Sequence, residues 1–197
     1  MAATIEQKEL APIDDSNRYR IGMWVGLASI AMMFTALSSA YMVRAASAND
    51  WFPLARPRVL FASTAIILIS SGTLEVARRK LKASMVSGYS RWLLFTGLLG
   101  VSFLVSQFIA WRQLRAQGVY LVSNPHSSFF YLLTAAHAVH LVAGLLALLY
   151  LVLRTRARAN QTVINARSRA VTDAVSIYWH FMDVLWIYLF LLLFFWR

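Results

Sequence analysis

Residues 178–196 constrain the fold of this chain more than any other segment. The segment is long and apolar enough to cross a bilayer, because about 20 apolar residues in a helix span the hydrocarbon core. It nevertheless contains His180 and Asp183, and a second apolar run contains His137 and His140. An ionisable side chain within the membrane is expensive unless it has a partner or a function. The sequence therefore predicts a membrane protein with a seam of polar side chains.

Five apolar runs qualify as membrane-spanning helices in this chain of 197 residues, which is 59% hydrophobic. We expect the helices at about residues 20–43, 59–77, 92–112, 129–153 and 174–196. A bilayer admits only helices or closed barrels, and these runs lack the alternation of barrel strands. The connections are short, so no second domain is expected. The fold class is all-α: a polytopic membrane helix bundle at residues 19–197, after a short tail at residues 1–18.

Lys and Arg residues are distributed unevenly between the connections. Thirteen of the 19 fall in the N-terminal tail and in the second and fourth connections, and six fall on the opposite side. Under the positive-inside rule this places the N-terminus in the cytoplasm and the C-terminus outside. Five crossings also require the termini to lie on opposite faces, so the two arguments agree.

The composition excludes several classes of site. The chain has no cysteine, which excludes disulfides, iron–sulfur clusters and thiolate ligation of zinc or haem. A net charge of +11 would suggest nucleic-acid binding in a soluble protein. Here the basic residues lie between apolar runs, as membrane topology requires, so no nucleic-acid partner is expected.

Two of the four ionisable residues of the seam lie at comparable depths. With a rise of ~1.5 Å per residue, His140 and Asp183 fall at similar heights in the membrane, so they can touch if their helices pack side by side. Three interpretations remain open. The favoured one is a structural polar network that fixes helix packing, formed by His137, His140, His180 and Asp183. A metal site built from the same side chains and a proton path or ion site are the alternatives.

Other residues are expected to shape helix contacts and the membrane interface. Helix packing is expected at Gly22, Gly26 and Gly144, because small residues let a neighbouring helix approach. A charge cluster at the cytoplasmic end is expected from the spacing of Glu75, Arg78 and Arg79. Lipid headgroup contacts are expected at Arg154, Arg156, Arg158, Trp179 and Trp186. Interfacial tryptophans are expected at Trp24, Trp51, Trp92, Trp111, Trp179 and Trp196.

Four segments resemble one known family, in the order in which that family carries them. YWHFMDVLW at 178–186 closely resembles YWHFVDVVW, the last-helix pattern of subunit III of the haem–copper oxidases. HAVHLVAG at 137–144 resembles the family's HGLHV-type segment, and STAIILISSGT at 63–73 resembles its NTxxLLxSSxT helix. Residues 17–44 are similar to its RxGMxLFIxSExxFF helix. The resemblance extends over most of the chain and matches the short, five-helix form of the family.

This resemblance implies an accessory role. Members of the family carry no haem and no copper, which belong to subunits I and II. They pack beside subunit I, bind phospholipid and help to maintain proton uptake. The resemblance therefore implies no catalytic, cofactor-binding or metal-binding residue in this chain. The residues that match the family pattern are His137, His140, Gly144, Trp179, His180, Asp183 and Trp186.

Two positions depart from the family pattern. Ile30 and Ala110 stand where the family usually carries glutamates within the membrane, so a role of those glutamates is not implied here. The electron donor, cytochrome c or a quinol, also stays open. We expect an accessory subunit of a respiratory cytochrome c oxidase in the bacterial cytoplasmic (inner) membrane. The alternatives are a subunit of a quinol oxidase or nitric oxide reductase, a free-standing membrane metalloenzyme, and a proton carrier.

Overall fold

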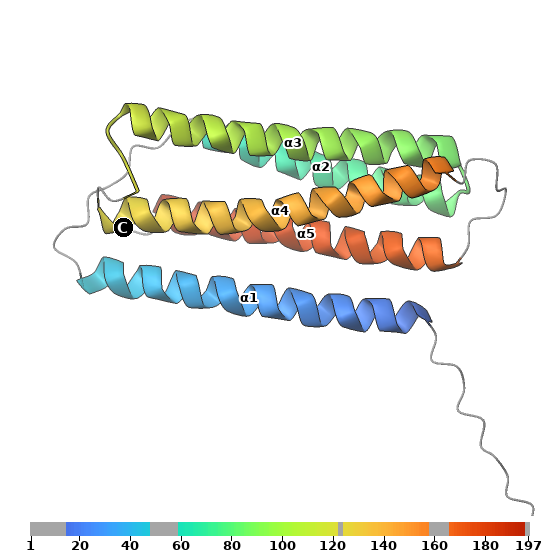
Figure 1. Cartoon of the computed structure of the whole chain (residues 1–197), viewed down its shortest axis with the longest axis horizontal. Coiled ribbons are helices and arrows are strands. Elements are labelled where there is room, and N and C mark those ends of the chain that lie inside the picture. Colours follow the sequence, from blue (N-terminus) through green and yellow to red (C-terminus); the bar gives the residue numbers. More distant parts are fainter. Residues whose placement is uncertain (1–14, 48–58, 122–123, 158–165, 196–197) are drawn as a thin grey trace, which may run out of the picture.

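In the computed structural model of the chain, five long helices lie beside one another and each reverses the direction of the one before (Figure 1). They are α1 (Asp15–Ser47), α2 (Val59–Lys82), α3 (Val86–Ala116), α4 (Pro125–Ala157) and α5 (Ala166–Phe195). The structure describes residues 15–47, 59–121, 124–157 and 166–195, so most of the predicted tail lies outside it. Within these ranges all five helices are long and apolar enough to cross a membrane, which confirms the all-helical, multi-pass fold class.

Most helix ends lie beyond the apolar runs. α3 and α4 extend past both ends of the runs at 92–112 and 129–153. A helix satisfies its own backbone hydrogen bonds, so it continues into the polar interface until the local sequence stops it. Pro125 is the first residue of α4, where its missing N–H leaves no helical hydrogen bond unmade. An apolar run therefore locates a membrane helix but underestimates its length.

α2 and α3 form a helical hairpin with a very short turn. Ser84 adopts a φ of 59° in this turn, and the Met85 N–H donates to the Lys80 carbonyl oxygen at 2.9 Å. Within the hairpin, the hydroxyl oxygens of Thr73 and Thr96 form a hydrogen bond of 2.9 Å. These contacts hold α2 and α3 side by side, and the two helices make the most extensive pair in the bundle.

The remaining helices are arranged around α5. This helix packs against α1, α2 and α4, and its fully buried Trp179 and Trp186 are the largest side chains of the core. In the described part of the chain, α1 contacts α4 and α5 but neither α2 nor α3. Figure 1 shows α1 at one edge of the bundle, with α4 and α5 between it and the α2–α3 hairpin. Two polar residues of α5, Ser176 and Asp183, are therefore buried within the bundle.

Candidate functional site

Two tryptophans of α5 attach this helix to α2. The indole nitrogen of Trp179 donates to Ser70 Oγ at 3.0 Å. That of Trp186 donates to Thr64 Oγ1, also at 3.0 Å. Both rings are fully buried, so the prediction that they contact lipid headgroups is wrong, and so is the interfacial position of Trp179. A buried indole needs an acceptor for its N–H, and the hydroxyls of α2 supply it.

His180 and Asp183 lie on the side of α5 that faces α2. Ser71 Oγ is 2.5 Å from His180 Nδ1. Asp183 is only 3% exposed, and neither of its carboxylate oxygens has a hydrogen-bond partner among the described residues. The Ser71 hydroxyl of α2 also lies near the Asp183 carboxyl group. Ser71 of α2 thus bonds His180 and lies near the buried carboxyl group of Asp183.

His137 of α4 is buried among aromatic rings. Its ring centroid lies 5.9 Å from that of Phe103 on α3 and 5.2 Å from that of Trp186 on α5. Neither ring nitrogen has a partner among the described residues. His137 therefore contributes ring packing where three helices meet.

His140, one turn further along α4, faces α1. Its Nδ1 lies 2.8 Å from the carbonyl oxygen of Ala136 in the same helix. Its ring meets the ring of Phe34 from α1 edge-on, with centroids 5.7 Å apart. The Tyr178 hydroxyl of α5 donates to the His140 carbonyl oxygen at 2.7 Å. This histidine consequently joins α4 to α1 and α5 through contacts that the sequence did not indicate.

The predicted network of four ionisable side chains is not formed. No hydrogen bond between described residues joins any two of His137, His140, His180 and Asp183, and the expected contact of His140 with Asp183 is absent. Equal depth in the membrane is not sufficient for contact, because rotation about the helix axis decides which neighbour a side chain meets. His180 and Asp183 point toward α2, whereas α5 meets α4 with aromatic rings.

Two glycines make room for Trp179. A Cβ on Gly100 of α3 would lie 2.8 Å from the Trp179 ring and 2.9 Å from Leu145. A Cβ on Gly144 of α4 would lie 3.1 Å from Tyr178 and 3.3 Å from Trp179. The close approach at Gly144 agrees with the expectation from sequence. Gly100 was missed because its role depends on a ring from a distant helix.

Gly22 and Gly26 lie on the outward face of α1. A Cβ placed on either would have nothing within 4 Å among the described residues. The helix contact expected at these glycines is not made within the described part of this chain, and it stays a prediction for contact with another chain.

The two positions that depart from the family pattern lie in the packed interior. Ile30, one turn after Gly26, is half-buried and packs against the core, while Ala110 of α3 is fully buried.

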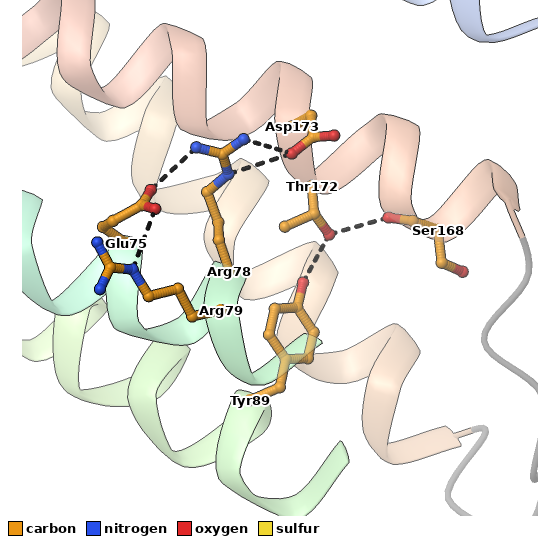
Figure 2. A network of polar contacts seen from close by, with 7 residues as sticks. All are labelled: Glu75, Arg78, Arg79, Tyr89, Ser168, Thr172 and Asp173. Atoms are coloured by element: carbon orange, nitrogen blue, oxygen red, sulfur yellow. Dashed lines mark hydrogen bonds and ion pairs between the residues drawn. The ribbon is translucent and has the colours of Figure 1, made fainter. Parts of the chain in front are cut away.

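A charge cluster ties α2 to α5 near the α2–α3 turn (Figure 2). Arg78 Nη1 donates to Glu75 Oε2 at 2.9 Å, and Arg79 Nε lies 3.5 Å from Glu75 Oε1, which are the pairs that the spacing predicts. Arg78 also donates from Nε and Nη2 to Asp173 Oδ1 of α5, at 3.1 and 2.7 Å. Figure 2 shows the guanidinium group between the two carboxylates. Asp173 was missed because it comes from another helix.

Two of the arginines expected to bind lipid, Arg154 and Arg156, lie in the last turn of α4, at this same end of the bundle. Arg154 Nη1 donates to the Tyr150 hydroxyl at 3.5 Å, and Arg156 is exposed. Arg158, Trp51 and Trp196 lie outside the described residues. Among the other tryptophans, Trp24 is exposed, while Trp92 and Trp111 are half-buried. The lipid contacts and these interfacial positions stay predictions.

The described residues contain no group of three or more His, Cys, Asp and Glu side chains that could hold a metal ion. The interior polar side chains instead join helices, chiefly α5 to α2 and α4. Fold and site together define a class: a multi-pass helical membrane protein whose buried polar residues mostly serve helix association.

Comparison with known proteins identifies the family. The family model of cytochrome c oxidase subunit III matches residues 13–197. A probable cytochrome c oxidase subunit 3 of Mycobacterium tuberculosis is 32% identical over 185 residues, which cover 92% of this chain and 89% of the relative. The cytochrome c oxidase subunit 3 of Thermostichus vulcanus is 30% identical over 202 residues, which cover 98% of each chain. The chain belongs to the cytochrome c oxidase subunit III family, which confirms the resemblance found in the sequence.

Proposed function

We propose that this chain is an accessory subunit of a bacterial cytochrome c oxidase. Oxygen is reduced to water at haem and copper centres that partner subunits hold. The observation that carries the proposal is the family match over residues 13–197. The use of the interior hydroxyl and indole groups in helix contacts supports a structural task for the chain.

The chain stabilises the oxidase by packing beside subunit I, within a complex that also contains subunit II. The outward face of α1, with Gly22 and Gly26 open to close approach, supports such a helix contact. The N-terminus lies in the cytoplasm, because the last turns of α2 and α4 are basic and both helices end where α1 begins (Figure 1). The host membrane is the bacterial cytoplasmic membrane.

Phospholipid binding and support of proton uptake are two further roles in this proposal. Arg154 and Arg156 supply positive charge for anionic headgroups at the end of α4. His180 and Asp183 place ionisable groups inside the membrane, where such groups often serve proton movement.

Purification of the complex tests the assignment. A tag on the N-terminal tail should recover, in mild detergent, a many-helix partner and haem bands in a reduced-minus-oxidised visible spectrum. Turnover with reduced cytochrome c and then with a quinol identifies the electron donor. Faster turnover with a quinol would assign the complex to the quinol oxidases. A solitary, colourless protein would overturn the oxidase assignment, and stoichiometric metal bound to it would favour a membrane metalloenzyme.

A further inference from the structure

Polar side chains follow the α2–α5 interface from the charged end of the bundle toward its middle. At that end Arg78 bonds Asp173, and deeper in the membrane Ser71 bonds His180. Each deeper residue lies seven positions from its counterpart, which is about 10 Å along a helix. Glu75 lies between these two contacts on α2 and pairs with Arg78. We call these five residues, together with Asp183, the α2–α5 row.

Asp183 is the member of the α2–α5 row furthest from the charged end, and among the described residues it has no hydrogen-bond partner. It follows His180 by three positions on α5 and is 3% exposed. Neither carboxyl oxygen has a hydrogen-bond partner among the described residues. From α2, the Ser71 hydroxyl lies near it. The two histidines of α4 are engaged elsewhere, His137 with aromatic rings and His140 with α1, and neither bonds the carboxyl group.

A carboxyl group in this position requires solvation. Moving an unpaired polar group from water into an apolar environment is unfavourable, and moving an unpaired charge is far more so. Internal water commonly satisfies buried polar groups that the protein leaves unpaired, and each such water typically makes about three hydrogen bonds. The Asp183 oxygens, the Ser71 hydroxyl and the His180 ring supply the necessary polar partners in one place.

We propose that Asp183, Ser71 and His180 form an internal water-binding site between α2 and α5. The site holds the neutral carboxylic acid, and its proton exchanges with the aqueous phase at the charged end of the α2–α5 row. In each exchange the carboxyl O–H bond breaks as a water oxygen accepts the proton. A different proton of that water passes to the carboxyl oxygen, so no net charge stays in the membrane. This site belongs to the chain itself and does not depend on the oxidase assignment.

Infrared spectroscopy of the full chain in lipid bilayers tests the site. We expect a carboxylic C=O stretching band that moves when the chain is made with ¹³C-aspartate. The band should shift within minutes of transfer into D₂O, because water reaches the carboxyl group. It should be lost in Asp183→Asn. The isotope shift assigns the band to aspartate without a substitution, so the test also works if that variant fails to fold.

Two neighbouring serines provide the matched comparison. Ser71→Ala should shift the band and slow its exchange, because it removes a partner of the water. Ser70→Ala should leave the band unchanged, because the Ser70 hydroxyl accepts from Trp179 instead. A band that fails to shift in D₂O over hours would show a dry site and overturn the proposal. The absence of any protonated aspartate band would overturn it equally, and either result leaves the oxidase assignment standing.

Discussion

α1 and α2 both pack against α5, but they are attached in different ways. α2 is joined to α5 by two indole hydrogen bonds, a serine–histidine contact and an ion pair. α1 instead presents buried apolar and aromatic side chains, among them Leu27, Phe34 and Tyr41, and the rings of the last two contact α4. Only 17% of the most apolar 18-residue stretch of α1 is buried, compared with 39% of the corresponding stretch of α5. α2 is therefore attached by directional hydrogen bonds and an ion pair, whereas α1 is attached mainly by the packing of apolar side chains.

This difference matters because lipid tails are as apolar as leucine. An apolar side chain gains little when it leaves lipid for a protein neighbour, so hydrogen bonds and close packing decide which helices associate. The α2–α5 contact is therefore specified by this chain itself. The position of α1 is less strongly specified by this chain, and contact with a helix of another subunit can fix it.

The largest expected effect comes from filling the space that Trp179 occupies. Gly100→Val forces a clash, since even a Cβ would lie 2.8 Å from the ring. We expect a destabilisation of about 3 kcal/mol, measured as a lower unfolding midpoint in detergent. Gly97→Val is the matched control, because nothing lies within 4 Å of a Cβ there. Equal losses in both variants would contradict the role of Gly100.

Removal of an indole donor should weaken the α2–α5 contact directly. Trp179→Phe deletes the hydrogen bond to Ser70 and part of the ring, which should cost about 2 kcal/mol. Trp24→Phe, on the exposed side of α1, should change the unfolding midpoint little. If Trp24→Phe proved the more damaging variant in the isolated chain, the contrast between α1 and α2 would fail.

His180→Ala removes the contact with Ser71 and should cost about 1 kcal/mol. We expect a lower yield of assembled complex, with unchanged haem and copper signals for each complex recovered. The comparison is made by visible spectroscopy at equal subunit I content. A missing redox centre in an otherwise intact complex would argue for a role of His180 beyond helix packing.

The ion pairs at the charged end should contribute less. The Arg78 side chain is 24% exposed and that of Asp173 is 44% exposed, so solvent screens their attraction. Arg78→Gln should cost about 0.5 kcal/mol and lose its effect at high salt. Arg91→Gln, an exposed arginine of α3, is the control. A large effect that persists in high salt would contradict this estimate.

The smallest effect on the chain alone is expected at Gly22 and Gly26. Leucine at both positions has open space around it, so the unfolding midpoint of the isolated chain should hardly move. Recovery of subunit I in a pull-down should fall, because the outward face of α1 would no longer permit close approach. Unchanged recovery would show that this face meets lipid instead.

The sequence predicts features of this molecule that depend on one helix at a time. The apolar runs predict five helices, and the spacing of Glu75 predicts its pairing with Arg78 and Arg79. Apart from the close approach at Gly144, features that depend on two helices were not predictable, because rotation and register are set by packing. Asp173 was missed for this reason. Trp179 was misplaced at the interface because its acceptor lies on α2, far away in the sequence.

The position of Trp179 has a consequence for biosynthesis. Its ring meets Ser70 of α2, Gly100 of α3 and Gly144 of α4, yet it belongs to the last of the five helices to leave the ribosome. The earlier helices thus enter the bilayer before the side chain that they surround has been made. A nascent chain interrupted before α5 lacks the ring around which these three helices close.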